Sequence, residues 1–239
     1  MKYIVTLIIS CFTFVSYAQN FVLDTNDSSV TTEYNDGKLW AYRHSDNYIV
    51  GLTCYEHNDD YGKYYQIQIY IHNLSAQSTT FDPEDISASV INKKGDSIAL
   101  QVFTNEEYQK KVQQMQGLAM ALYGFAAGVN AGSAAYSTSY STTISPNGTF
   151  YTTTHYNPAA SYQANLATNL QIANMGKMMT DERITKEQGY LKITTIHPNF
   201  GIRGYMNIKR KKGSILTINI PIDSNIYSFE WDVNKNNYQ

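Results

Sequence analysis

Hydrophobic and polar residues alternate along several short segments in the first and last thirds of the chain. In the clearest of them, Ile67, Ile69 and Ile71 alternate with polar neighbours. This period of two is typical of a β-strand with one buried face. The same pattern predicts strands at 39–44, 48–56, 64–72, 86–90, 98–102, 202–208, 216–222 and 227–233.

Turn signals separate these segments. Residues 58–62 (Asn-Asp-Asp-Tyr-Gly) predict the turn of a β-hairpin, and 93–96 (Lys-Lys-Gly-Asp) and the basic run 209–213 predict two more. Short strands with turns every 8–12 residues indicate two packed antiparallel sheets. The sequence therefore predicts a mainly β (α+β overall) protein with an antiparallel β-sandwich.

The middle of the chain has a helical pattern instead. Thr104 and Glu107 have the spacing of a capping box, and Asn157-Pro158 begins a second helix that we expect to run to about Lys186 and to end at Gly189. The loop between them, from about 133 to 156, is rich in Ser, Thr and Tyr, and we expect it to be mobile. Apolar residues at spacings of three and four predict a single apolar face on the first helix. They are Tyr108, Val112, Met115, Leu118, Leu122, Phe125 and Val129.

The N-terminus has the pattern of an export signal. Lys2 precedes an apolar run over 3–15, and Ser16-Tyr17-Ala18 supplies small residues for cleavage after Ala18. We therefore divide the chain into a signal peptide (1–18), the first part of a sandwich (19–103), a helical hairpin (104–188) and the second part of the sandwich (189–239). The expected location is the periplasm, the outer membrane or the extracellular space. A weaker alternative is lipidation at Cys11, since residues 8–11 loosely resemble a lipoprotein cleavage box.

Composition and charge exclude some classes of function and fold. The 239 residues are 43% hydrophobic and 16% charged, with a net charge of -2, so no nucleic-acid partner is expected. Two cysteines exclude a disulfide-stapled fold or a Cys-rich zinc fold. After cleavage only Cys54 remains, and its place in an alternating segment predicts a buried thiol.

The hairpin contains the longest uncharged stretch. No Asp, Glu, Lys or Arg occurs among the 65 residues from Val112 to Gly176. Glycines at spacing four and alanines on the second helix allow close backbone approach. Three interpretations stay open: packing within one chain, self-association or binding of a protein partner, and contact with a lipid surface. A transmembrane hairpin is disfavoured by its many amide side chains. The hypothetical interaction face comprises Leu118, Leu122, Gly124, Phe125, Gly128, Gly132, Ala160 and Ala164.

Motifs for catalysis and metal binding have simpler explanations. Gly95-Asp96-Ser97 resembles an esterase nucleophile block, but it follows a turn and leads into a strand, without an Asp-x-x-His pair elsewhere. The acidic group at 56–60 is interpreted as a hairpin turn rather than a cation site. The five histidines lack metal-binding spacing, and the basic run 209–212 is interpreted as a solvated turn. We therefore expect no enzyme activity, cofactor or metal.

Several loose motifs across the mature chain resemble a group of uncharacterised exported proteins of Gram-negative bacteria. This resemblance implies an immunoglobulin-like β-sandwich interrupted by an Ala/Gly/Tyr-rich helical insert, and it implies no functional residue. The motifs are 81–86 (Phe-Asp-Pro-Glu-Asp-Ile), Glu106-Glu107-Tyr108, 119–132, the Tyr/Ser/Thr-rich loop, Asn157-Pro158-Ala159, Tyr190-Leu191-Lys192, Pro198 and Gly204-Tyr205.

The sequence as a whole favours an exported, non-catalytic interaction or assembly module of the cell envelope, with contacts through the uncharged hairpin. Two alternatives remain. One is an envelope protein that associates with a membrane surface through the hairpin. The other is a glycan-binding module that uses some of the 21 tyrosines as stacking surfaces.

Overall fold

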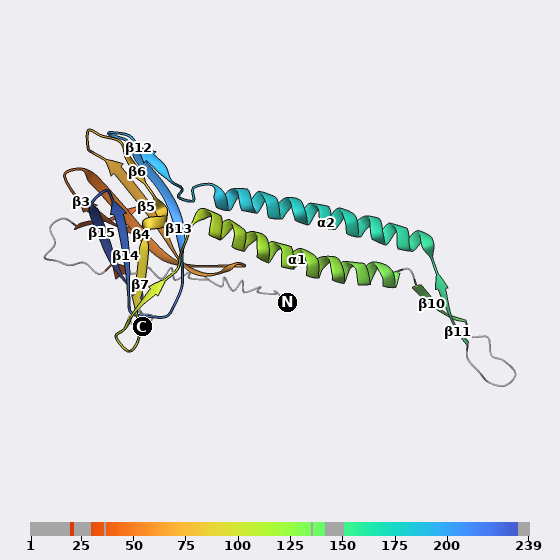
Figure 1. Cartoon of the computed structure of the whole chain (residues 1–239). Helices are drawn as coiled ribbons and strands as arrows, with labels where there is room; N and C mark the ends of the chain where they lie inside the picture. Colours follow the sequence, from red (N-terminus) through yellow and green to blue (C-terminus); the bar gives the residue numbers. More distant parts are fainter. Residues whose placement is uncertain (1–19, 22–29, 36, 135, 142–150, 234–239) are drawn as a thin grey trace, which may run out of the picture.

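A computed structural model describes residues 20–21, 30–35, 37–134, 136–141 and 151–233. It consists of antiparallel sheets from which two long helices extend side by side (Figure 1). The prediction of a mainly β protein with two helices is confirmed. The predicted signal peptide, its predicted cleavage site and Cys11 lie outside the described residues.

The larger sheet has six strands in the order β2-β3-β4-β5-β13-β9. The long β4–β5 hairpin forms its centre, and β13 pairs with β5 over the full length of β13, from Gly201 opposite His72 to Lys209 opposite Tyr64. The strands are β2 (Val30–Asn35), β3 (Lys38–His44), β4 (Tyr48–Asp59), β5 (Gly62–Asn73), β9 (Val102–Phe103) and β13 (Gly201–Lys209).

The second sheet has five strands in the order β1-β15-β14-β7-β8, and a separate two-stranded sheet joins β6 to β12. The strands are β1 (Asn20–Phe21), β6 (Thr79–Phe81), β7 (Ser87–Ile91), β8 (Ser97–Leu100), β12 (Thr194–Ile196), β14 (Ile215–Ile222) and β15 (Asn225–Asp232), with a short 3-10 helix η1 (Pro83–Asp85) between β6 and β7.

The hydrophobic core lies between the two large sheets. Ile67, Ile69 and Ile71 of β5 belong to the same buried cluster as Ile218 of β14 and Trp231 of β15. Burial alternates along β5 and β14 as the sequence pattern predicts. Cys54 is buried in this cluster, and desolvation raises the pKa of its thiol, so the prediction of a buried cysteine is confirmed.

One predicted strand is divided between the two sheets. The sequence pattern places Ile98, Leu100 and Val102 on one strand, but β8 belongs to the five-stranded sheet and β9 to the six-stranded sheet. The buried positions are Leu100 and Phe103, three residues apart, because the chain changes sheets at Gln101. The carbonyl of Gln101 accepts the amide of Lys209 at 2.8 Å, which attaches the crossing to the end of β13.

Both helices begin as their capping signals predict. Helix α1 (Asn105–Ala134) starts with the reciprocal Thr104–Glu107 capping box, in which both hydrogen bonds are 3.1 Å long. Helix α2 (Pro158–Glu187) starts with Asn157, whose side chain accepts two backbone amides. Gly189 follows the end of α2 with a φ of 79°, in the left-handed region that favours glycine.

At the far end of the helical pair, the structure has a two-stranded ribbon where the sequence predicts a loop. Strands β10 (Tyr136–Ser141) and β11 (Tyr151–Tyr156) pair in an antiparallel ribbon, with Tyr136 opposite Tyr156. Tyr and Thr favour strands, so the composition that predicts a mobile loop also suits this ribbon. Residues 142–150 lie outside the described residues.

An aromatic cluster joins the helices to the six-stranded sheet. Ring centroids lie 5.8 Å apart for Tyr64 and Tyr108, 5.4 Å for Tyr108 and Tyr190, and 4.9 Å for Tyr190 and Tyr205. The Tyr190 hydroxyl donates to the carbonyl of Phe103 at 2.7 Å. Because these rings come from β5, α1, β13 and the segment after α2, they bind both ends of the helical segment to the sheet.

Gly204 allows the segment after α2 to pack on β13, which gives a first testable prediction. A Cβ atom there would lie 2.7 Å from Leu191 Cδ2 and 2.8 Å from the carbonyl oxygen of Gly189. We expect Gly204→Ala to lower the free energy of unfolding by about 2 kcal/mol in chemical denaturation, since backbone must shift. Gly117→Ala, in open space on α1, is the control. Equal effects of the two substitutions would contradict this packing.

Candidate functional site: the projecting helical hairpin

Helices α1 and α2 run antiparallel away from the sheets (Figure 1), and each is about 45 Å long at about 1.5 Å per residue. Their contacts define which residues lie level with each other. The Gln116 amide donates to the carbonyl of Met179 at 3.0 Å, and the Tyr123 hydroxyl donates to Gln171 Oε1 at 2.9 Å. The ideal Cβ position of Gly176 is 4.0 Å from Met120 Cε. The inner face of α1 is therefore formed by Gln116, Met120 and Tyr123.

The large apolar side chains of α1 lie on its other side. Phe125 is 76% exposed, Leu122 64% and Leu118 56%. At 3.6 residues per turn these positions lie between about 120° and 180° around the helix from Gln116. We call this surface the α1 stripe, and it comprises Met115, Leu118, Leu122, Phe125 and Val129.

This placement corrects the expectation of one continuous apolar face on α1. Tyr108 and Val112 are buried, because at the base of the hairpin the helix packs on the six-stranded sheet. Beyond Val112, Gln116 contacts both Tyr61 of the β4–β5 turn and Met179 of α2, and further along α1 the Tyr123 side chain contacts α2, which approaches a different side of the helix. The pattern at spacings of three and four therefore describes two environments, a buried base and an exposed stripe.

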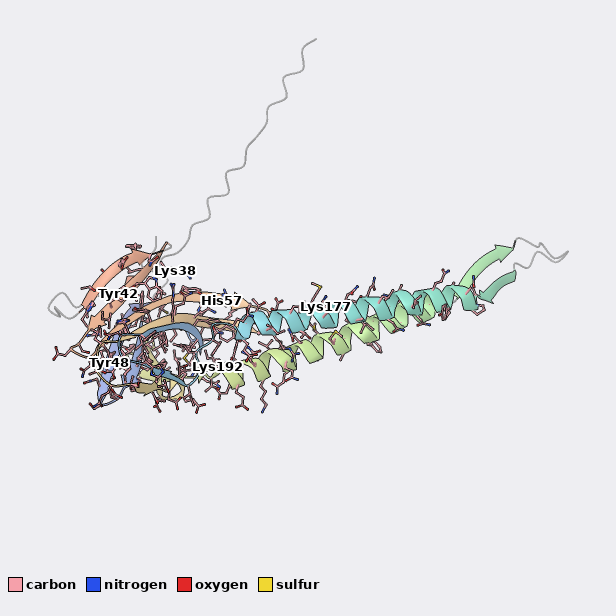
Figure 2. All side chains as sticks on the ribbon, turned by 90° about the horizontal axis from the view of Figure 1, so that it is seen from above. Lys38, Tyr42, Tyr48, His57, Lys177 and Lys192 are labelled. Carbon is pink, nitrogen blue, oxygen red and sulfur yellow. The ribbon has the colours of Figure 1, made fainter. Side chains whose placement is uncertain are left out.

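Helix α2 has no buried residue and also has an apolar outer surface. Its half-buried positions recur every three or four residues at Ala164, Thr168, Ile172 and Met175, which makes them its inner face. Tyr162 is 70% exposed and Leu170 59%. We call the outer surface the α2 stripe, and it comprises Tyr162, Leu166, Leu170 and Ala173. Figure 2 shows side chains standing out from both helices along their length.

The described glycines of the predicted interaction face do not join the two helices. A Cβ atom added at Gly124 or Gly128 would meet nothing within 4 Å. Ala160 and Ala164 are half-buried on α2, and the surroundings of Gly132 lie outside the described side chains. The predicted face is therefore divided: Leu118, Leu122 and Phe125 lie on the α1 stripe, and Gly124 and Gly128 lie outside both the stripe and the inner face.

A carboxylate in the β4–β5 turn connects the sheet to both helices. Asp59 Oδ1 accepts the backbone amides of Tyr61 and Gly62 at 2.9 and 3.0 Å. Its Oδ2 accepts the Tyr108 hydroxyl of α1 at 2.9 Å and the Lys186 ammonium of α2 at 3.0 Å. Burial raises the pKa of Asp59, but the bonds from Lys186, Tyr108 and Tyr61 outweigh it, so that the pKa lies below its usual value.

Tyr61, in the same turn, extends this connection. Its hydroxyl donates to Glu182 Oε2 of α2 at 2.6 Å and accepts from Gln116 of α1 at 3.1 Å. Burial, followed by the neighbouring Glu182 carboxylate, raises the pKa of Tyr61 to about 12. We call Asp59, Tyr61, Tyr108, Gln116, Glu182 and Lys186 the base network. The sequence showed the turn and its acidic residues, but not the helix partners, which lie 49 to 127 residues away.

The other motifs with possible chemistry have structural roles. Gly95, with a φ of 89°, lies in the turn between β7 and β8, where Asn92 accepts the amides of Lys94 and Asp96. Glu56 pairs with Arg210 of the basic run at 2.8 Å. Within the described ranges no three His, Cys, Asp or Glu side chains form a group that could hold a metal ion.

Tyrosines contribute much of the interior. Tyr48, Tyr61, Tyr64, Tyr65, Tyr108, Tyr190 and Tyr227 are buried. A third of the tyrosines are thus used in packing and in buried hydrogen bonds, rather than as exposed stacking surfaces.

Two open grooves follow the hairpin. One, of about 660 Å³, lies where Tyr123 of α1 meets the methionines Met175, Met178 and Met179 of α2. The other, of about 750 Å³, lies nearer the base and is polar, with Gln109, Lys110 and Arg183 in its walls. Methionine side chains adapt to differently shaped partners, so the first groove adds to the apolar surface of the hairpin.

In the described part of the chain, no helix has the length and apolar character needed to span a lipid bilayer.

Comparisons of the chain with protein-family models, curated proteins and solved structures find no match. Function is therefore inferred from the geometry and chemistry of the chain itself.

The base network predicts a pH-dependent loss of stability. We expect Asp59→Asn to lower the free energy of unfolding by about 2 kcal/mol near neutral pH, because Lys186 loses the closer of its two carboxylate partners, Asp59 and Glu182, in a partly buried site. The folded state favours the ionised carboxylate. The ionised Asp59 carboxylate therefore stabilises the folded state above about pH 4, and this stabilisation is lost as pH falls through the lowered pKa of Asp59.

Urea denaturation at several pH values measures this difference. Asp60→Asn, which changes the exposed neighbour in the same turn, is the matched control and should have little effect at any pH. A difference between wild type and Asp59→Asn that persists unchanged at pH 3 would show that the carboxylate charge does not hold the helices.

The open space at Gly128 gives a prediction for the isolated chain. We expect Gly128→Ala to raise the free energy of unfolding by up to about 1 kcal/mol in dilute solution, because alanine favours a helix and nothing obstructs its methyl group. Thermal denaturation followed by far-UV circular dichroism measures the change. A clear loss of stability would mean that the glycines pack closely within the chain.

Proposed function

We propose that this protein is an exported, non-catalytic interaction or assembly module of the cell envelope, whose helical hairpin makes the contacts. In this proposal the two packed sheets form an immunoglobulin-like sandwich, the hairpin is an insert between its strands, and residues 1–18 are a cleaved signal peptide. The sequence supports export through its charged, apolar and small-residue regions in the expected order.

The observation that carries this proposal is the exposure of large apolar side chains on both outer surfaces of the hairpin. Phe125, Leu122 and Tyr162 are between 64% and 76% exposed, and they lie in a stretch without formal charge. Apolar surface in water costs about 25 cal/mol per Å² relative to burial. Contiguous exposed apolar surface on a soluble protein marks a site of interaction.

The composition of the hairpin is that of an interface core. Five of the seven methionines lie on it: Met115, Met120, Met175, Met178 and Met179. Methionine and aromatic residues are enriched at interface cores, and charged residues are depleted there. A helix designed to face water alone would carry charges on its outer side, which this stretch lacks.

The base network supports a hairpin that is held out as a rigid element. Asp59 and Tyr61 bind both helices, and the aromatic cluster packs beneath them. Few contacts to the sheets exist beyond that base (Figure 1). A rod anchored at one end presents its outer surface to whatever lies beside it.

Site-specific photocrosslinking in the native cells tests this function. A photoreactive phenylalanine analogue in place of Phe125 is expected to form adducts of higher mass, because that position faces the partner. The matched control is the same analogue at Phe200, which is 67% exposed but lies outside the hairpin. Adducts from Phe200 but not from Phe125, or from neither position, would refute a contact-making hairpin.

A further inference from the structure

The two apolar stripes lie on opposite flanks of the hairpin and at matching heights. Each stripe faces away from the other helix, so one flank belongs to α1 and the other to α2. The observed contacts place Gln116 level with Met179 and Tyr123 level with Gln171. Counting along the two antiparallel helices from these contacts places Phe125 level with Leu170, Val129 with Leu166 and Leu122 with Ala173.

This matching has a consequence for two copies in the same orientation. If a second copy lies beside the first, the α1 stripe of one chain meets the α2 stripe of the other, with large apolar side chains paired at the Phe125–Leu170 and Val129–Leu166 levels and the smaller Ala173 opposite Leu122. We propose that copies of this chain assemble side by side through this contact, with parallel hairpins. The inference rests on the proposed function and names its partner as a second copy.

Charge favours a second copy over other occupants. Both stripes lie within the uncharged 112–176 stretch, so two copies approach without repulsion. Helices that lie on a lipid surface carry Lys and Arg on their polar face, and none occurs in this stretch. A strongly charged protein partner would likewise find no complementary charge along the stripes.

The exposed area reaches the lower limit for an interface. From their exposed fractions and ordinary sizes, the side chains of the two stripes expose roughly 900 Å² of apolar surface, which is the most that one junction can bury. With the polar atoms around them, the total is about 1,000 Å², the minimum for a specific interface.

The contact joins two different surfaces, which determines the kind of assembly. A heterologous contact leaves one free α1 stripe and one free α2 stripe on every pair, so further copies add until a ring closes or a filament grows. Parallel hairpins keep all sheet domains at one end and all β10–β11 ribbons at the other. The base network holds the hairpins at the common angle that such a repeat requires.

Disulfide trapping between purified full-length variants, each also carrying Cys11→Ser so that Cys54 is the only native cysteine, tests this arrangement. Phe125→Cys and Leu170→Cys are prepared separately, mixed and oxidised. We expect a disulfide dimer between the two variants, and much less from either variant alone, because each stripe meets the other kind. Cys54 is buried and does not compete. The double variant F125C/L170C should form a ladder of covalent multimers, since its two cysteines lie on opposite flanks and cannot join within one chain.

The matched control replaces Leu170→Cys with Ile226→Cys, which is 68% exposed on β15. Its trapped yield with Phe125→Cys should be lower by about tenfold or more. A second variant, Phe125→Ser, should keep its helical circular dichroism while its solution mass by light scattering falls toward that of one chain.

Three outcomes would overturn the assembly. Efficient dimers of Phe125→Cys alone would show a symmetric contact between like stripes. A single-chain mass for wild type, without trapped dimers, would exclude self-association. Equal trapping of the Ile226→Cys control would show random collision. In the second case, adducts from a photoreactive group at Phe125 would still support the proposed function, with a different protein or a lipid as partner.

Discussion

The architecture depends on one carboxylate that is shared by three elements. Asp59 ends β4, accepts the amides of its own turn, and holds Tyr108 of α1 and Lys186 of α2. Because these bonds come from both helices, they fix where the hairpin leaves the six-stranded sheet and in which direction. The aromatic cluster around Tyr64 and Tyr190 fills the space below this point and excludes water from it. Without this junction the helices would be attached only by the chain segments at their ends.

The same junction explains why the outer surface of the hairpin is exposed to solvent. The sheet covers Tyr108 and Val112 at the base, and beyond them each helix has the other as its neighbour. The inner seam includes a buried amide, Gln116, and small or flexible side chains, so it contributes less burial than a seam of Leu and Ile would. The larger apolar groups lie outside. A helical pair built in this way leaves its larger apolar groups exposed, which agrees with the proposed role in assembly.

Local signals predicted a large part of the fold. The capping box at Thr104 and the Asn157-Pro158 start were confirmed because each depends on side chains within three residues of the backbone groups they bind. Burial alternates as predicted along β5 and β14, since one buried face is enough to set a period of two, whereas β4 is buried on both faces over residues 50–54. The strand expected over 98–102 was wrong because the chain crosses between sheets there, and a short apolar run looks the same on either sheet. The ribbon β10–β11 was missed because Ser, Thr and Tyr suit both loops and paired strands.

The sequence by itself determined the strands, the ends of both helices, the buried Cys54 and the uncharged stretch, because these depend on neighbouring residues and on burial pattern. Only the tertiary structure decided which side of α1 meets α2, since apolar spacing defines a stripe but not what covers it. It also decided that Gly124 and Gly128 lie in open space, and that Asp59 serves as the junction. Those features depend on contacts between residues far apart in the chain. Which residues meet is determined by where the sheets hold the base of the hairpin.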